Sequence, residues 1–341
     1  MLVAIRAIAV LLVLLSFAAP VTAWDRGQVT RFATLPAGAE HPEGITVDGK
    51  GNVYVTTFAV AGTSSGTGQM FVHDSTGKLL RQVNVEGSST LLLDLAFHPQ
   101  TKDLLVIDFG GKQVLSVNPV NGKSKLFTTI PGGAAAGPNV LTFDAAGNVY
   151  VSDSFQGAIW RTGPQGGTAT AWVQSALLTT SGVPPFGANG LAFNNAGDSL
   201  FVCNTGNDSV VRIPVASGGA AGTPETFVNS VNGCDGLIID ESDNLWIAAN
   251  QADEIVVVNP SGRAIAKLGD FGGIDGTGAP IGLLFPASLV RSGGFIYVTN
   301  LSLDLRLFGL AQTVDSQWAA QVTTHTVSKI PAVIPSVPGL P

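Results

Sequence analysis

A pattern of two short apolar strands joined by a turn occurs six times along this chain. The first strand of each copy opens with a polar or small residue, and the turn is rich in Gly, Asp or Asn. The copies occupy residues 41–57, 92–108, 137–153, 187–204, 233–250 and 285–300. Aligned on the first strand, their leading residues lie 46 to 52 positions apart, at Glu43, Leu93, Asn139, Asn189, Asp235 and Ala287. A repeat of this length is typical of one four-stranded blade, so the sequence predicts an all-β, six-bladed β-propeller.

The sequence between the copies supplies further strands. Each of the first five copies is followed by a third strand and a more variable fourth, as at 69–73 and 79–85. Residues 29–35 resemble a fourth strand but precede the first repeat, so we expect this N-terminal strand to complete the last blade and close the ring. The propeller is then predicted over 24–330, followed by an extended Pro-rich tail at 331–341.

Three segments between the repeats are rich in Gly, Ser, Thr or Pro, at 59–68, 176–185 and 269–284. They are candidate lids or rim loops, with ordinary connectors as the alternative.

Only 12% of residues are charged and 42 of 341 are Gly, which suits short strands and tight turns in one domain. The formal net charge is -7 without a clustered basic face, which argues against a nucleic-acid partner.

The N-terminus has the pattern of a signal peptide over residues 1–23. A short basic start precedes an apolar run at 7–17, and Val21-Thr22-Ala23 supplies the small residues of a cleavage site. We therefore expect an exported protein, secreted or periplasmic, with no stable membrane insertion after cleavage; an uncleaved anchor is the alternative.

The two cysteines, Cys203 and Cys234, are expected near the same face as buried thiols, with a disulfide as the alternative.

Closure of the ring would bring the six leading residues to one end of the central channel. Four of them carry side-chain oxygens: Glu43, Asn139, Asn189 and Asp235. Two carboxylates and two amides are hard ligands that suit one divalent cation, with Ca²⁺ expected first and Mg²⁺, Mn²⁺ or Zn²⁺ as alternatives. Such a cation could polarise a substrate carbonyl and lower the pKa of a bound water. The alternative is that these residues only cap strands and turns.

Several short motifs in order along the chain together resemble one family. They are His41-Pro42-Glu43-Gly44, Pro138-Asn139, Asn189-Gly190-Leu191, Asp235-Gly236-Leu237 with Asn244-Leu245-Trp246-Ile247-Ala248, and Pro286-Ala287-Ser288 with Ile296-Tyr297-Val298-Thr299. The chain resembles the gluconolactonase, regucalcin (senescence marker protein) and luciferin-regenerating enzyme family over nearly all of its predicted mature length.

The resemblance implies a propeller that holds one divalent cation in its channel and hydrolyses lactones or related esters. It also implies roles for individual residues. Glu43, Asn189 and Asp235 would be the metal ligands, and Asn139 would contact the substrate or complete the metal shell. Asp235 would serve as general base as well.

The chain departs from the family pattern beside the predicted substrate. Many members have Asn-Asp-Gly where this chain has Asn139-Val140-Leu141, and an Arg where it has Gly137. Loss of that Arg predicts a lactone or ester more apolar than a sugar lactone. The alternative function is a non-catalytic propeller of the NHL-repeat kind that binds a ligand or protein partner. The two acids among the leading residues favour the enzyme, and no Glu stands where a strictosidine-synthase-like propeller would need one.

Overall fold

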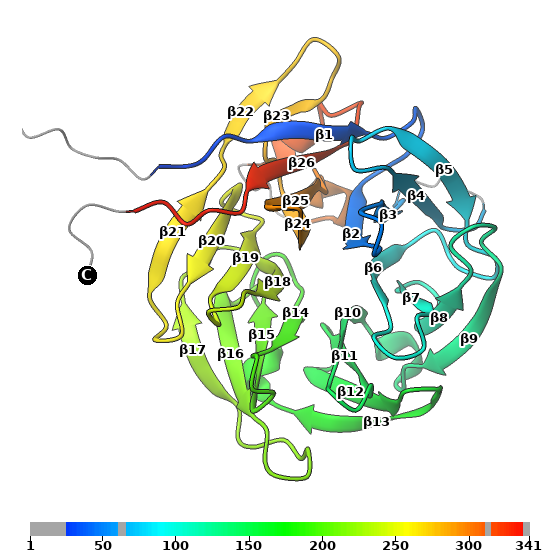
Figure 1. Cartoon of the computed structure of the whole chain (residues 1–341), viewed down its shortest axis with the longest axis vertical. Coiled ribbons are helices and arrows are strands. Elements are labelled where there is room, and N and C mark those ends of the chain that lie inside the picture. The colour runs from blue at the N-terminus through cyan, green and yellow to red at the C-terminus, as the bar shows by residue number, and fades with distance from the viewer. Residues whose placement is uncertain (1–24, 61–65, 311–314, 337–341) are drawn as a thin grey trace, which may run out of the picture.

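The protein folds as a ring of antiparallel sheets around a central axis (Figure 1). The computed structural model describes residues 25–60, 66–310 and 315–336. Within them, six sheets have four strands each, and the innermost strand of every sheet begins one of the predicted repeats. The six-bladed β-propeller predicted from the repeat spacing is confirmed. The predicted signal peptide at 1–23 lies outside the described residues.

The strands of the first five blades follow in chain order from the channel outward. Blade 1 contains β2 (Pro42–Val47), β3 (Val53–Thr57), β4 (Gln69–His73) and β5 (Leu79–Asn84). Blade 2 contains β6 (Leu92–Phe97), β7 (Leu104–Asp108), β8 (Gln113–Val117) and β9 (Ser124–Thr129). Blade 3 contains β10 (Pro138–Phe143), β11 (Val149–Asp153), β12 (Ala158–Gly163) and β13 (Gly166–Gln174). Blade 4 contains β14 (Ala188–Phe193), β15 (Ser199–Asn204), β16 (Ser209–Pro214) and β17 (Glu225–Asn229). Blade 5 contains β18 (Cys234–Ile239), β19 (Leu245–Ala249), β20 (Glu254–Val258) and β21 (Ala264–Leu268).

The sixth blade joins the two ends of the propeller. It contains β24 (Pro286–Ser292), β25 (Phe295–Asn300) and β26 (Thr326–Pro331), and its outermost strand is β1 (Thr30–Thr34). β1 pairs antiparallel with β26, so the N-terminal strand closes the ring as predicted. This pairing covers the edge that β26 would otherwise expose.

Helices are few and short in the described part of the chain. They are η1 (Gly133–Ala135), η2 (Ala176–Leu178), η3 (Leu305–Phe308) and α1 (Ser316–Ala319). Among the described residues, no helix is long and apolar enough to span a bilayer. The segment predicted as a rim loop at 269–284 instead forms an extra hairpin of β22 (Phe271–Ile274) and β23 (Pro280–Gly282).

Aspartates fix the tight turn between the first two strands of several blades. Asp48 accepts hydrogen bonds from the backbone N–H groups of Lys50 and Asn52 and from the hydroxyl of Tyr54. Asp144 likewise accepts from the Asn148 N–H and the Tyr150 hydroxyl in blade 3, and Asp240 accepts from the Asn244 N–H and the Trp246 indole in blade 5. A side chain that satisfies its own turn explains why Asp opens these turns.

All six innermost strands carry an irregularity at the same place. In each, the register shifts across two residues near the strand's start, as between Pro42 and Ile45 or Pro138 and Leu141. The leading residue of each repeat lies inside this bulge. Because a bulge changes the direction of its side chains, it accounts for the turn of these residues toward the channel axis.

A disulfide joins Cys203 to Cys234, so the expectation of two free thiols is wrong. Cys203 lies in β15 of blade 4, and Cys234 begins β18 of blade 5. The strands bring the two Cα atoms to 5.2 Å, which is within the usual range for a disulfide. The bond fixes the start of the strand that carries Asp235 to the neighbouring blade.

Candidate active site

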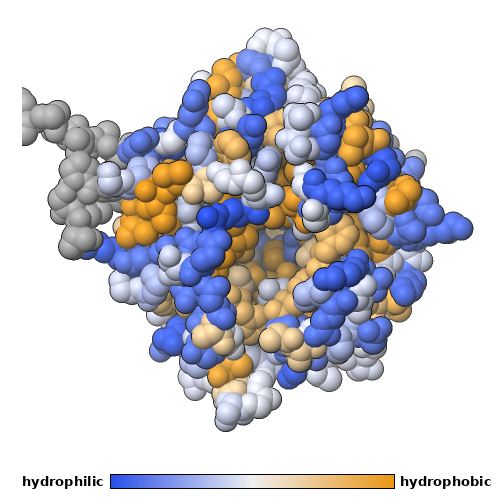
Figure 2. Space-filling model, in the orientation of Figure 1, coloured by the Kyte–Doolittle hydropathy of each residue, from blue (hydrophilic) through white to orange (hydrophobic). Residues whose placement is uncertain are grey.

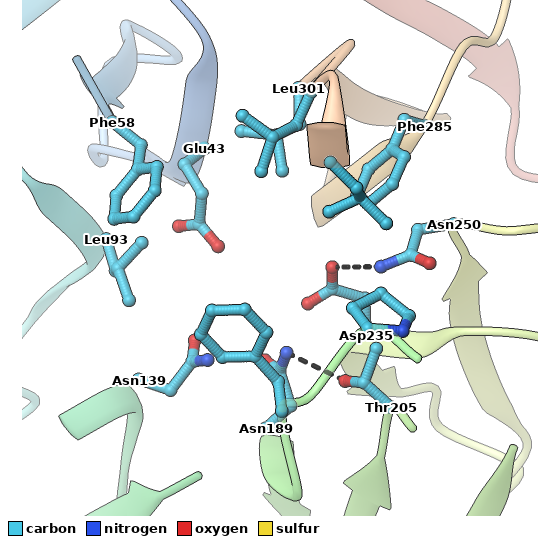
Figure 3. Close-up of a pocket in the computed structure, with 14 residues that line it drawn as sticks. Glu43, Phe58, Leu93, Asn139, Asn189, Thr205, Asp235, Asn250, Phe285 and Leu301 are labelled. Atoms are coloured by element: carbon cyan, nitrogen blue, oxygen red, sulfur yellow. Dashed lines mark hydrogen bonds between the residues drawn. The ribbon is translucent and has the colours of Figure 1, made fainter. Parts of the chain in front are cut away.

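Side chains predicted as ligands from four different blades line one cavity at an end of the channel (Figure 3). The cavity measures about 40 Å³, which is room for only a few water-sized groups. Glu43, Asn139, Asn189 and Asp235 are each at most 4% exposed. Of the other two leading residues, Leu93 also lines the cavity, whereas Ala287 is buried but is not among the lining residues.

The residue that follows the second strand of each blade stands next to the leading residue. Its N–H donates to the carbonyl two positions before the leading residue, at 2.9 to 3.2 Å in all six blades. The six equivalent residues are therefore Phe58, Phe109, Ser154, Thr205, Asn250 and Leu301. They are polar in blades 3 to 5 and apolar in blades 1, 2 and 6. The channel end is consequently divided into a polar and an apolar half.

The polar residues of this set orient the predicted ligands. Thr205 donates its hydroxyl to the Cys234 carbonyl at 2.8 Å and accepts from Nδ2 of Asn189 at 2.9 Å. A hydroxyl that already donates can only accept from the amide, so the Asn189 oxygen faces away from it. Ser154 orients Asn139 in the same way. Its hydroxyl donates to the Ala188 carbonyl and accepts from Nδ2 of Asn139 at 3.0 Å. In blade 5, Nδ2 of Asn250 donates to Oδ2 of Asp235 at 2.8 Å.

Each of the four predicted residues retains one buried oxygen without a hydrogen-bond partner. These atoms are Glu43 Oε2, Asn139 Oδ1, Asn189 Oδ1 and Asp235 Oδ1. A buried acceptor without a partner is costly, because water no longer solvates it. Four such oxygens in one cavity provide the hard, partly anionic donor set that a divalent cation requires. The residues present therefore fit the predicted cation.

The two carboxylates are held in an environment that opposes their ionisation. Burial, followed by the charges of Asp235 and Asp94, raises the pKa of Glu43 well above its usual value. Burial also raises the pKa of Asp235 to about 7, although the hydrogen bond from Asn250 acts in the opposite direction. A bound cation would favour the charged forms that burial disfavours.

The apolar half of the site comes largely from segments outside the repeats. Besides Phe58 and Leu93, the cavity is lined by Pro184, Phe186, Phe285, Leu301, Leu303 and Leu305. Pro184 belongs to one of the predicted lid segments. Residues 301–305 follow β25 in a long connection before β26, where the sequence had suggested no lid. The site thus places oxygen ligands against a hydrophobic wall.

The other end of the channel is a separate hollow of about 360 Å³. It is lined by the later residues of the innermost strands, such as Ile45, Leu141 and Ile238. The blades run clockwise in Figure 1 and anticlockwise in Figure 3, so the two figures view opposite ends. Figure 2, in the orientation of Figure 1, shows this hollow at the centre with hydrophobic residues around it. Asp94 lines it and accepts from the Leu141 N–H at 3.0 Å, and burial raises its pKa to about 6.

Comparisons with known proteins support the resemblance seen in the sequence. A family model described as the SMP-30/Gluconolactonase/LRE-like region matches residues 184–269, which include all the strands of blades 4 and 5. The predicted resemblance is confirmed. Among curated protein sequences, no significant match to the chain was found.

Several solved structures share the fold of this chain, although their sequences are less than 20% identical to it. A luciferin-regenerating enzyme matches with a TM-score of 0.65 and 17% identity, covering 90% of this chain and 96% of that one. A regucalcin from Agrobacterium tumefaciens, described as a calcium-binding protein, matches with a TM-score of 0.62 and 13% identity over 89% and 94%. A gluconolactonase from Xanthomonas campestris matches with a TM-score of 0.61 and 13% identity over 90% of each chain.

Acids and histidines near the cavity do not form a metal site of their own in the described part of the chain. The described residues contain no group of three or more His, Cys, Asp or Glu side chains able to hold a metal, because the cavity combines two acids with amides. His41, two residues before Glu43, does not line the cavity. Its Nδ1 lies 2.9 Å from the Leu301 carbonyl, and its ring packs against His325.

Proposed function

We propose that the protein is a metal-dependent hydrolase of a lactone or related ester. The observation that supports this most strongly is the set of four buried, unpartnered oxygens from separate blades in one cavity. Strand caps would use their oxygens in the turn, as Asp48 does, and would not leave them facing a channel. The gluconolactonase-like match over 184–269 supports the same chemistry.

In this proposal Glu43, Asn189 and Asp235 hold the cation, and Asn139 contacts the substrate or completes the metal shell. When bound, a divalent cation polarises a carbonyl oxygen and acidifies a water molecule. Asp235 would also act as general base, the role that the family resemblance implies for it. The apolar half borders the reacting group with hydrophobic side chains.

The alternative is a non-catalytic, NHL-like propeller that binds a ligand or protein partner. In a propeller without a cation or a reaction, two buried carboxylates with unpartnered oxygens would lower stability and serve no purpose. Their presence favours the hydrolase.

We also propose that the protein is exported. The pattern of residues 1–23 supports a signal peptide. The Cys203–Cys234 disulfide supports it independently, since such bonds persist mainly in oxidising compartments.

The test is hydrolysis of a panel of lactones and aryl esters by the mature protein, with chelator and after readdition of Ca²⁺, Mg²⁺, Mn²⁺ or Zn²⁺. We expect chelation to abolish activity and one cation to restore it. Asp235→Ala should lower kcat/KM by at least about 100-fold, because it removes a ligand and the base. Asp198→Ala, at an exposed turn of blade 4, is the control and should retain activity. Full activity in chelator, or no hydrolysis with any cation, would refute the proposal.

A further inference from the structure

Four phenylalanine rings form a continuous cluster that leads from the cavity to the surface. Phe58 and Phe186 line the cavity, and Phe155 is 45% exposed. Phe109 links them, with ring centroids 5.7 Å from Phe58, 5.7 Å from Phe155 and 6.3 Å from Phe186. Phe155 and Phe186 are 5.5 Å apart. These separations are typical of aromatic rings in direct contact.

Gly137 explains how Phe155 reaches this place. A Cβ added to Gly137 would lie 2.7 Å from Cδ2 of Phe155, so the ring packs directly over the glycine backbone. Gly137 is the position at which the resembling family often has an Arg. The absence of a side chain at Gly137 therefore leaves space for the Phe155 ring over the glycine backbone.

The cluster is held in place by its surroundings. The N–H of Gly206 donates to the Phe186 carbonyl, and that of Gly187 donates to the Ser154 carbonyl, at 2.9 and 3.0 Å. Nζ of Lys112 lies 4.1 Å from the Phe109 ring centroid and 6.0 Å from that of Phe155. An aromatic wall that is already ordered loses little entropy when a ligand binds.

We propose that this cluster is a subsite for an aryl group of the substrate. The inference rests on the proposed function, which places the carbonyl among the oxygens of blades 1, 3, 4 and 5. The cluster begins at Phe58 and Phe186 in the cavity wall and ends at the exposed ring of Phe155, so an aryl substituent beside the carbonyl would pack against the outer surface of these rings. Aromatic edges and faces there offer stacking that a methyl substituent cannot match.

The test compares the binding of two lactones, γ-phenyl-γ-butyrolactone and γ-methyl-γ-butyrolactone, by NMR titration of the mature protein with and without Ca²⁺. We expect the phenyl compound to bind about tenfold more tightly or better, from the buried aryl area. Phe155→Ser should reduce that ratio severalfold. Gly137→Ala, which displaces the Phe155 ring, should reduce it in the same direction. Phe308→Ser is the matched control, because Phe308 is 44% exposed and makes no ring contact with the cluster.

The outcomes separate this inference from the proposed function. Equal affinity for the two lactones, or an equal loss in Phe308→Ser, would overturn the aryl subsite even if both compounds are hydrolysed. A phenyl preference that depends on Phe155, without hydrolysis under any cation, would support the subsite and overturn the hydrolase.

Discussion

Thr205 gives its hydroxyl hydrogen to the Cys234 carbonyl and leaves only lone pairs for the Asn189 amide. This contact turns the Asn189 oxygen toward the cavity, and Ser154 has the same effect on Asn139. At the scale of single residues, the site therefore depends on side chains that need not touch a cation themselves. Residues of this kind tune affinity by holding ligands in one orientation.

Replacing Thr205 by Val tests this dependence. Without the hydroxyl, Asn189 loses the partner that fixes its amide, and we expect cation affinity to fall about 10- to 100-fold. Stability should fall by about 1 to 3 kcal/mol, because the buried Asn189 amide and Cys234 carbonyl both lose this partner. Calorimetric titration measures the affinity, with Thr226→Val on the outermost strand of the same blade as control. Unchanged affinity in Thr205→Val would show that amide orientation is not limiting.

Cation binding should weaken as pH falls through about 7. Burial raises the pKa of Asp235 to about 7 and that of Glu43 well above its usual value, so protons compete for both carboxylates. In the cation-free protein these groups favour the protonated form, and stability is lost as pH rises from about 4 toward 7. The increase in Tm caused by Ca²⁺ should therefore be larger at pH 8 than at pH 5.5. An increase of the same size at both pH values would contradict this prediction.

Cavity residues that recur at the same place in each repeat could be predicted from the sequence, whereas those in the connections between repeats could not. Glu43, Asn139, Asn189 and Asp235 were predictable because they recur at blade spacing. Ser154, Thr205 and Asn250 were missed, although each follows the leading residue by 15 or 16 positions and directly follows a second strand. By contrast, Phe186, Leu303 and Leu305 lie in connections without a repeat. Only tertiary packing brings them to the cavity.

At the scale of elements, the bulged innermost strands pack closely against one another. A Cβ on Gly190 would lie 2.2 Å from the Asp235 carbonyl oxygen, and one on Gly44 would lie 2.4 Å from that of Leu93. These glycines let neighbouring blades approach where the side chains of the proposed ligands emerge. The distance between blades at the site is thus set by backbone contact.

Gly190→Ala should separate blades 4 and 5 at the site. Because the obstructing atom is backbone, we expect a loss of about 1–3 kcal/mol in the free energy of unfolding and weaker cation binding. Gly49→Ala is the control, since a Cβ there meets nothing within 4 Å and the change should stay within about 0.5 kcal/mol. Urea denaturation measures the free energy of unfolding of both variants. Equal stability of the two variants would exclude close packing at Gly190.

Most strands were predictable because their apolar periodicity is clear. The predicted strand at 69–73 coincides with β4, and the strand predicted at 79–85 ends one residue beyond β5. The β22–β23 hairpin was missed because its sequence, with repeated Gly and few β-branched residues, has little strand propensity.

At the scale of the whole molecule, two links hold the ring together. β1 closes blade 6 by pairing with β26, and the disulfide joins blades 4 and 5. The sequence predicted the first because residues 29–35 match the other fourth strands. It could not decide the second, since pairing of two cysteines depends on the distance between blades that only the closed ring defines.

Removing the disulfide should lower stability without opening the ring. The disulfide closes a loop of 31 residues. For a loop of this length we expect the free energy of unfolding to fall by about 3 to 4 kcal/mol in the Cys203→Ala/Cys234→Ala variant. Urea denaturation with and without reductant measures the loss. If reductant changes the wild-type midpoint no more than that of the variant, the bond contributes nothing to stability.

The central claim is that oxygens from separate blades share one cation on the channel axis. The most direct measurement is anomalous X-ray diffraction from crystals soaked in Mn²⁺ after chelation. The account predicts one strong peak in the cavity, about 2.0 to 2.6 Å from oxygens of Glu43, Asn189 and Asp235. A cavity without a peak, or a peak bound only elsewhere on the molecule, would contradict it.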